Sequence, residues 1–365
     1  MEQISFARGN PSPDLLAVSE LADCAKAAIE RDGARILNYG PVGGYPPLRE
    51  WIAAQHGVEP EQVLVLNGSL QGLALLVELF GHRGPILVEA PTYDRPLKLV
   101  AMRGGEVRPV PQNEDGLDVD ALAAELDRGP APAFLYVLPT FQNPSGRTLP
   151  LESRRRLVEL ARERGLLIVE DDPYGRVRFS GEPLPTLYEL AGGENVVYSS
   201  SFSMTVAPGI RVGYILVSRE LAAQIEARAV QTYLAPAFVG QATIHEFATR
   251  GLLEPNIERV CSVLRGRRDA MVGALEETLG GTAAWSHPDG GYFLWLDLPA
   301  DVDTRALLPR AEASGVTFVP GADFFVGDGE AGRSSLRLAY SFVGADAIRE
   351  GIGRLAALLA LPAAV

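Results

Sequence analysis

The chain has 365 residues, of which 47% are hydrophobic and 22% are charged, a composition typical of a globular protein large enough for two cores. Its formal net charge of -13 and its lack of a basic stripe argue against binding to a nucleic-acid backbone. Cys24 and Cys261 are far apart and belong to no CxxC or Cys/His cluster, which excludes a disulfide framework and a metal site. We expect both cysteines to be buried.

The N-terminal residues Met1 to Asn10 include Glu2 and Arg8 and lack the apolar core of a secretory signal. No stretch of the sequence is long and apolar enough to span a membrane. We therefore expect a cytoplasmic protein without a membrane partner.

Short apolar runs alternate with helical patterns through the first 217 residues. Six runs bounded by turn residues are predicted as strands, over residues 62–66, 85–89, 133–138, 166–170, 195–199 and 211–217. Between them, apolar residues recur at spacings of three and four, which predicts crossover helices over 70–80, 93–102 and 151–164. Strands separated by helices imply an α/β domain with a mostly parallel sheet.

The pattern changes to long helices from residue 220 onward, and one helix is expected over 255–279. The strands and helices predicted after it are those of a smaller α+β domain, with strands over 291–297, 316–319 and 335–340 and helices over 304–314 and 345–359. The predicted division is an N-terminal segment, 1–45, that packs with the small domain, a large domain, 46–250, and a small C-terminal domain, 251–365.

An acid pair follows one of the most apolar predicted strands, in the sequence Glu170-Asp171-Asp172-Pro173-Tyr174. This position places a carboxylate at the carboxyl edge of the sheet, where α/β proteins bind their ligands. A structural role, as a helix cap or in an ion pair, is also open for either aspartate.

Two further segments have the composition of an anion site. Residues 199–211, Ser-Ser-Ser-Phe-Ser-Met-Thr-Val-Ala-Pro-Gly-Ile-Arg, combine hydroxyl groups and an arginine around a tight turn, which suits a phosphate. Residues 67–71, Asn-Gly-Ser-Leu-Gln, open a helix directly after a strand, so that backbone amides and the helix dipole could hold an anion. Gly-Ser is also a common helix cap.

In this order, the segments resemble the class I aminotransferases, which are pyridoxal-phosphate enzymes of fold-type I, and above all the branch of 2-aminoadipate and kynurenine aminotransferases. The resemblance spans essentially the whole chain, and its other motifs lie at residues 4–7, 39–41, 44–49, 89–93, 141–146, 290–295, 318–321 and 336–338. It implies a large cofactor-type domain with a mostly parallel, seven-stranded-type sheet, a smaller α+β domain, and a homodimer.

The resemblance also implies roles for the residues of a cofactor site. Asp171 would pair with the pyridinium nitrogen of the cofactor, Asn143 and Tyr174 would hydrogen-bond the ring hydroxyl, and Tyr93 would stack on the ring. The residues implied at the phosphate are Ser69, Leu70 through its backbone amide, Ser201, Ser203, Arg211 and, from the neighbouring subunit, Tyr39.

Substrate binding is implied for a second set of residues. Arg337 would bind the α-carboxylate of a substrate through its two-pronged guanidinium, with Asn143 beside it. Arg8 stands where the family usually has glycine and could recognise an extra anionic group, or it could form an ion pair with one of the acidic residues. Tyr93, Tyr292 and Arg337 could also have purely structural roles.

The chain departs from the family at Met204, because the resemblance expects the Schiff-base lysine there. A thioether has no exchangeable proton and forms no imine, so ordinary transamination should be crippled or absent. Tyr174 or a partner's Tyr39 could move a proton instead, although a phenol with a pKa of about 10 is a poor base. Lys98 is expected on a helix, away from the ring.

These residues lead to one main hypothesis and three alternatives. The main hypothesis is an enzyme that binds pyridoxal 5'-phosphate or pyridoxamine 5'-phosphate non-covalently, binds no metal, and acts on an amino-acid-like carboxylate substrate by non-standard chemistry in a small-molecule pathway. The alternatives are a cofactor-independent enzyme for cyclisation, condensation or isomerisation, a non-catalytic pseudoenzyme, and a conventional aminotransferase with an engineered lysine-to-methionine change.

Overall fold

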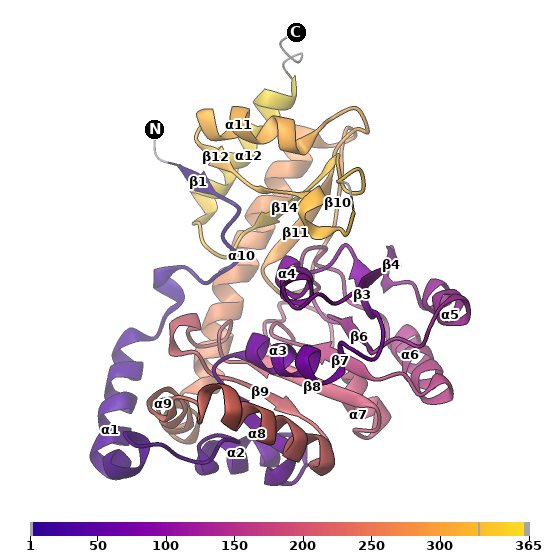
Figure 1. The fold of residues 1–365 in the computed structure, drawn as a ribbon. Coiled ribbons are helices and arrows are strands. Elements are labelled where there is room, and N and C mark those ends of the chain that lie inside the picture. Colours follow the sequence, from indigo (N-terminus) through magenta and orange to yellow (C-terminus); the bar gives the residue numbers. More distant parts are fainter. Residues whose placement is uncertain (1–2, 328, 361–365) are drawn as a thin grey trace.

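A central sheet of eight strands forms the larger part of the molecule, in the order β2-β9-β8-β7-β6-β3-β4-β5 (Figure 1). The computed structural model describes residues 3–327 and 329–360. Within this part of the chain the strands are β2 (Val63–Leu66), β3 (Ile86–Ala90), β4 (Val107–Asn113), β5 (Gly116–Leu117), β6 (Phe134–Val137), β7 (Ile168–Asp171), β8 (Val196–Ser201) and β9 (Gly213–Leu216).

The strands at the centre of this sheet are parallel, which confirms the predicted mostly parallel α/β arrangement. β4, β3, β6, β7 and β8 pair in parallel, whereas β9 runs antiparallel to both of its neighbours. The short strand β5 pairs antiparallel with β4 at the edge, which makes the described sheet one strand larger than the expected seven-stranded type. All six predicted strands overlap observed strands.

Helices cover both faces of the central sheet, because successive side chains of each strand point to opposite faces and both sets are apolar. One face packs against α3 (Ser69–Phe80), α4 (Asp94–Met102) and α8 (Arg219–Tyr233). The helices that share a core with the other face are α1 (Val18–Ile36), α2 (Pro46–His56), α5 (Val119–Arg128), α6 (Leu151–Arg164), α7 (Leu187–Ala191) and α9 (Phe238–Thr249).

A smaller unit lies above the central sheet in Figure 1, and the long helix α10 (Leu253–Leu279) runs between the two. Its sheet has the order β10-β11-β14-β13, with strands β10 (Ala284–Trp285), β11 (Phe293–Asp297), β13 (Val319–Pro320) and β14 (Ser335–Ala339). Helices α11 (Thr304–Ala313) and α12 (Ala345–Ala360) complete this part. The single strand predicted over 316–319 is instead two short strands, β12 (Val316–Thr317) and β13, because the chain leaves one sheet for the other.

The N-terminal segment divides between the two units. Strand β1 (Ile4–Ser5) pairs in parallel with β12, and Leu15 belongs to the core of the small unit. Helix α1, in contrast, buries Cys24 and Ala28 in the core that α9 and the large sheet share. The expected packing with the small domain therefore applies to the residues before α1, and the domain boundaries stay predictions.

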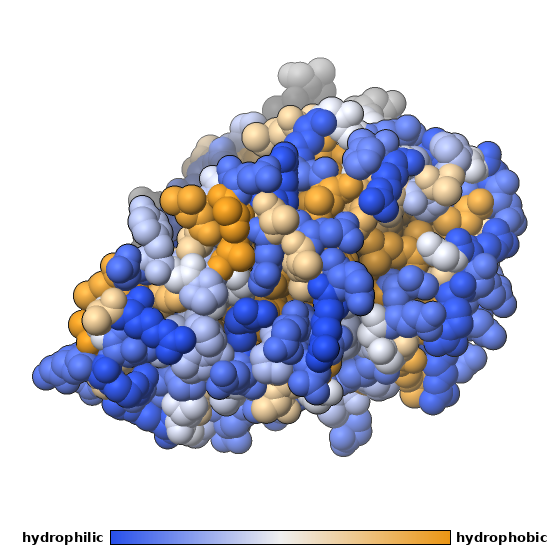
Figure 2. All heavy atoms as spheres, turned by 60° about the horizontal axis from the view of Figure 1, so that its bottom comes forward, coloured by the Kyte–Doolittle hydropathy of each residue, from blue (hydrophilic) through white to orange (hydrophobic). Residues whose placement is uncertain are grey.

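The surface shown in Figure 2 is mainly hydrophilic and carries separate hydrophobic patches. No helix in residues 3–327 or 329–360 has the length and apolar character needed to cross a membrane. Cys24 is buried as expected, but the prediction for Cys261 was wrong, because this residue is only half-buried on α10.

Candidate functional site

A cavity of about 160 Å³ lies where the carboxyl ends of β7 and β8 meet the N-terminus of α3. All but one of the residues predicted to bind the cofactor line this cavity, namely Ser69, Leu70, Tyr93, Asn143, Asp171, Tyr174, Ser201, Ser203 and Arg211, and Met204 lines it too. The fold thus brings together segments from residue 69 to residue 211, as the parallel strand order requires.

Asp171 is the last residue of β7 and has one oxygen without a partner. Its Oδ2 accepts a hydrogen bond of 2.6 Å from the Tyr136 hydroxyl, whereas Oδ1 is sealed from solvent and has no hydrogen-bond donor. Burial raises the pKa of Asp171 to about 6, although the Tyr136 hydroxyl lowers it. An unpartnered, desolvated carboxylate oxygen is costly unless a ligand donates to it.

Tyr136 was not predicted as a site residue from the sequence, where it stands inside the apolar run of β6. Strand pairing places Tyr136 opposite Val169, so that its side chain lies on the same face as Asp171. Burial raises the pKa of Tyr136 well above its ordinary value, and the phenol therefore acts as a donor at neutral pH. A tyrosine on a strand that neighbours an acidic strand end is the only signal the sequence offers.

Arg337 and Asn143 meet beside the cavity. The Nη1 of Arg337 donates to Oδ1 of Asn143 at 2.9 Å, and Nη2 donates to the Ala7 carbonyl at 2.9 Å. The guanidinium lies against the rings of Phe293 and Phe324, with centroid distances of 4.2 and 5.0 Å.

No carboxylate among the described residues forms an ion pair with Arg337, so the structural ion pair considered for it is not observed. Its Nε is buried without an acceptor, and burial lowers the pKa of Arg337 to about 10. The site therefore contains a desolvated cation as well as a desolvated anion, which are the groups that a zwitterionic or carboxylate ligand would satisfy.

Two tyrosines form the aromatic part of the site. Tyr174 is buried against Tyr292 and Phe293, with ring centroids 5.5 and 5.7 Å apart, and burial raises the pKa of Tyr174 well above its ordinary value. Tyr93 directly precedes α4 and is half-buried, and burial raises its pKa too. Both phenols keep their protons at neutral pH and can donate hydrogen bonds into the cavity.

At the end of the cavity near the N-terminus of α3, two glycines let neighbouring groups lie very close to the backbone. Gly68 caps α3 with φ 96°, and a Cβ there would lie 2.4 Å from Nη2 of Arg211. A Cβ on Gly213 would lie 2.4 Å from the backbone nitrogen of Ser69. Arg211 is exposed and donates to the carbonyls of Asn67 and Pro208 at 3.1 and 3.2 Å. The free amides of a helix N-terminus beside a guanidinium suit a phosphate.

The loop after β8 is fixed on both sides of Met204. The Tyr292 hydroxyl donates to the Met204 carbonyl at 2.6 Å, and the Asn256 amide donates to the Thr205 carbonyl at 2.7 Å. The amide of Ser203 donates to the Ser201 hydroxyl at 3.3 Å. The half-buried Met204 side chain packs against the core of the small unit.

The side chains that could have replaced the missing lysine, Lys98 and the four histidines, lie outside the cavity. Lys98 pairs with Asp94 on the exposed side of α4, at 2.5 Å, as expected for a residue on a crossover helix. None of the four histidines lines the cavity. Within residues 3–327 and 329–360, no group of three His, Cys, Asp or Glu residues is arranged to hold a metal ion.

Besides Arg337, which lies beside the cavity, two predicted binding residues lie outside it. Tyr39 is 81% exposed and lines a separate surface hollow with Leu37 and Phe238. The guanidinium of Arg8 lies 4.7 Å from the centroid of the Phe342 ring. The ion pair considered for Arg8 is not present in the described part of the chain, because this cation stacks on an aromatic ring instead.

A buried carboxyl group supports the Asn143 loop from behind. Glu89, at the end of β3, accepts hydrogen bonds from the Leu138 amide at 2.9 Å and from the side chains of Gln142 and Gln112 at 3.3 and 3.2 Å. Burial raises the pKa of Glu89 to about 8, so the group is mainly protonated at neutral pH. Glu89 thus holds the loop without adding a negative charge behind it.

The residues that line the cavity fit a pyridoxal-type cofactor. Oδ1 of Asp171 lacks the donor that a protonated ring nitrogen would supply, and Gly68 lets the Arg211 guanidinium lie against the N-terminus of α3, where a phosphate would bind. Together with the sheet order and the two-part architecture, these features define the fold-type I class.

Comparison with known proteins identifies the family. Residues 2–355 match the family of class I and II aminotransferases, and the chain belongs to that family. It is 38% identical over 356 residues to a 2-aminoadipate transaminase of Thermus thermophilus, which covers 96% of this chain and 89% of that relative. It is 35% identical over 364 residues to aromatic-amino-acid aminotransferase 1 of Thermococcus litoralis, covering 97% of this chain and 87% of that relative.

Solved structures agree with this assignment. The kynurenine aminotransferase of Pyrococcus horikoshii, in complex with PMP, superposes with a TM-score of 0.93 at 33% identity, over 98% of this chain and 91% of that one. An alpha-aminoadipate aminotransferase of Thermus thermophilus, complexed with N-(5'-phosphopyridoxyl)-L-leucine, gives a TM-score of 0.92 at 37% identity, over 98% and 92% of the two chains.

Proposed function

We propose that this aminotransferase-family protein binds pyridoxal 5'-phosphate or pyridoxamine 5'-phosphate without a covalent bond and acts on an amino-acid-like carboxylate substrate by a route other than ordinary transamination. The observation that carries this proposal is the pairing of an unpartnered Asp171 oxygen with Met204 in one cavity. The Asp171 oxygen lacks a donor that a protonated ring nitrogen would supply, whereas Met204 has no amine to bind the cofactor covalently.

The bound cofactor would supply an electron sink for bonds broken next to its ring. Asp171, held by Tyr136, would keep the ring nitrogen protonated, and the N-terminus of α3 with Ser201, Ser203 and Arg211 would bind the phosphate. Asn143 and Tyr174 would contact the ring hydroxyl, and Tyr93 the ring face. Leu70 would contribute its backbone amide.

Proton transfer is the task for which the cavity is least equipped. Tyr174 is the nearest candidate named from the sequence, but burial raises its pKa well above 10, so it holds its proton and donates a hydrogen bond rather than acting as a base. With Met204 in the lysine's position, no side chain supplies an amine for imine exchange or for proton transfer between carbon atoms. We therefore propose chemistry that does not depend on that transfer.

The substrate's carboxylate would bind to Arg337. The buried Nε has no acceptor, and the bond from Nη1 to Asn143 can be exchanged for one to a carboxylate. Arg8, exposed over Phe342, would meet only a substrate that extends to the surface.

We also propose that the protein is a cytoplasmic homodimer. Tyr39, Leu37 and Leu234 are 81, 67 and 57% exposed, and Tyr39 and Leu37 line one surface hollow with the partly buried Tyr233. Large side chains exposed on neighbouring segments favour a partner surface. Tyr39 would then reach the phosphate in the partner's cavity.

The experiment is a titration of the purified protein with pyridoxal phosphate, followed by absorbance and by thermal stabilisation. We expect saturable, dialysable binding to the unchanged protein and to Met204→Leu, the matched control, because neither has an amine at position 204. Met204→Lys should bind the cofactor covalently, as a mass increase after borohydride reduction. Absence of saturable binding to all three proteins would disprove the cofactor roles and favour a cofactor-independent or non-catalytic function.

A further inference from the structure

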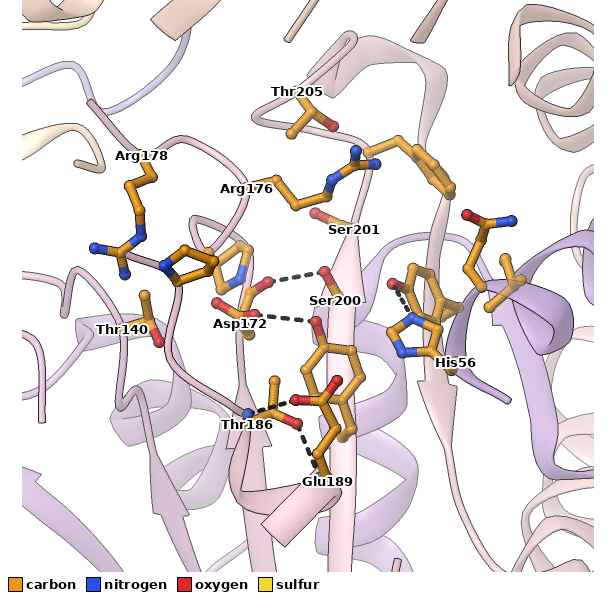
Figure 3. Close-up of a pocket in the computed structure, with 18 of the residues that line it drawn as sticks. His56, Thr140, Asp172, Arg176, Arg178, Thr186, Glu189, Ser200, Ser201 and Thr205 are labelled. Atoms are coloured by element: carbon orange, nitrogen blue, oxygen red, sulfur yellow. Dashed lines mark hydrogen bonds between the residues drawn. The ribbon is translucent and has the colours of Figure 1, made fainter. Parts of the chain in front are cut away.

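Figure 3 shows a second and larger cavity, of about 490 Å³. It lies on the opposite face of β8 from the first one, because Ser199 lines the first cavity whereas Tyr198 and Ser200 line the second. Its walls come from α2, from the loop that follows β7, and from β8 with its following loop. Nothing in the proposed function uses this cavity, and the inference drawn from it does not rest on that proposal.

The two cavities share a wall. Pro173 and Ser201 line both of them. The loop after β8 contributes to both cavities, since Ser203 and Met204 line the first whereas Phe202 and Thr205 line the second. A molecule in the second cavity would therefore touch the segment that shapes the first.

The acidic groups of the second cavity are already engaged by the protein. Oδ2 of Asp172 accepts the Tyr198 hydroxyl at 3.0 Å, and the backbone of Gly175 also lowers the pKa of Asp172 against the effect of burial. Glu189 accepts the Thr186 amide at 2.7 Å in a helix cap. Figure 3 shows both sets of bonds inside the cavity. Oδ1 of Asp172, however, is buried without a donor, so one acceptor of the cavity stays open.

The cationic groups of the cavity also retain donor capacity. Arg178 stacks over the Phe141 ring at 4.7 Å, donates one bond of 3.3 Å to the Ser180 carbonyl, and keeps a buried Nε without an acceptor. It forms no ion pair with any described carboxylate. Arg176 lies nearer the surface, where it pairs with Glu254 through one of its nitrogens. Two guanidiniums with free N–H groups suit an anion.

The remaining walls are apolar or neutral. Trp51 and Phe202 lie with ring centroids 6.4 Å apart and give the cavity an aromatic side. His56 shares a hydrogen bond of 3.0 Å with the Tyr214 hydroxyl, and burial lowers the pKa of His56, so this side carries no charge at neutral pH. The volume equals that of roughly sixteen waters at about 30 Å³ each, which is ample for a small organic molecule.

We infer that the second cavity binds a small organic carboxylate, whose charged group faces Arg178 and Arg176 and whose planar body packs against Trp51 and Phe202. The acid would be recognised by the N–H groups of Arg178 and Arg176 that have no acceptor in the protein. A bound acid would contact Ser201, which also lines the first cavity.

The test uses benzoate as the probe, with benzamide as its neutral isostere, in calorimetric titrations. Arg337→Gln serves as the background, because this change silences the carboxylate anchor of the first cavity. In that background we expect benzoate to bind at least tenfold more tightly than benzamide. Adding Arg178→Gln or the more exposed Arg176→Gln should weaken benzoate binding at least fivefold, whereas Arg178→Lys should lose less.

A second readout keeps the test independent of any variant that folds poorly. Benzoate should quench tryptophan fluorescence with the same Kd as the calorimetric one, and Trp51→Phe should abolish that quenching. The inference is overturned if benzoate does not bind in the Arg337→Gln background, if benzamide binds equally well, or if the fluorescence change survives Trp51→Phe.

Discussion

Asp171 and Asp172 are neighbours in sequence with opposite surroundings. Each accepts a hydrogen bond from a tyrosine, Tyr136 at 2.6 Å for Asp171 and Tyr198 at 3.0 Å for Asp172, and they line opposite cavities because strand residues alternate. Burial raises the pKa of both carboxyl groups.

The difference between the two aspartates lies in the cations around them. Arg154 and Arg178 lower the pKa of Asp172, whereas no cation acts on Asp171, whose carboxylate is helped only by hydroxyl groups. The protein compensates the charge of Asp172 itself and leaves that of Asp171 uncompensated. An uncompensated charge next to a cavity indicates a ligand of opposite charge.

The largest expected effect is on the pH dependence of stability without ligand. The pKa of Asp171 is raised from 3.8 to about 6 in the folded state, so protonated Asp171 adds to the free energy of unfolding. This contribution is fully present below pH 3.8 and is lost as pH rises through 6. Asp171→Asn does not titrate, so its free energy of unfolding should fall by up to about 3 kcal/mol less over this pH range, at 1.36 kcal/mol per pKa unit. Urea unfolding of both proteins from pH 4 to pH 8 measures it, and parallel curves would refute the uncompensated charge.

Cofactor affinity should separate the two aspartates next. Asp171→Asn loses a charge-assisted hydrogen bond of about 2 kcal/mol, which is roughly 30-fold in Kd. Asp172→Asn is the matched control and should bind pyridoxal phosphate within about threefold of the unchanged protein. Absorbance titration distinguishes the two, and equal losses would mean that the carboxylates do not have different roles.

The same comparison extends to two buried arginines. Arg267 donates to Asp14 at 2.8 Å, whereas Arg337 has no described carboxylate partner. Arg337→Leu should therefore leave stability unchanged or raise it by about 1 kcal/mol. Arg267→Leu should lower it by about 2 kcal/mol, because the buried Ser12 hydroxyl and Ser341 carbonyl lose their donor. Thermal unfolding without ligand measures both changes. A large loss for Arg337→Leu would assign that guanidinium a structural role.

The smallest effect is expected for the two phenols. Tyr136→Phe removes the donor to Asp171 and should weaken cofactor binding about fivefold at neutral pH, close to 1 kcal/mol. Tyr198→Phe makes the equivalent change at Asp172 and should not alter the Kd for the cofactor. If Tyr198→Phe weakened binding as much as Tyr136→Phe, the wall between the cavities would transmit the change.

The sequence predicts the fold well where strands are continuously apolar, as in β6 and β7. It fails at β4, where Pro109 and Pro111 interrupt the pattern, although proline is tolerated on the side of a strand that donates no ladder bond. The transition from β12 to β13 was also missed, because an apolar run does not reveal that the chain changes sheets.

Some residues of the candidate site could likewise be predicted from the sequence, and others could not. Motif residues such as Asp171 and Arg211 were predicted, because strand ends and a glycine-capped helix have local signatures. Tyr136 depends on the register between β6 and β7, which periodicity does not give. The second cavity depends on α2 meeting a loop that lies more than a hundred residues further along the chain.

The guanidinium of Arg337 also joins three separate stretches of the chain. It stands on β14, donates to Ala7 of the N-terminal segment, and donates to Asn143 in the loop between β6 and α6. A carboxylate that took the place of Asn143 would free this loop while Ala7 stayed attached. Ligand binding would then loosen the Asn143 loop, which amide hydrogen exchange in that loop can follow.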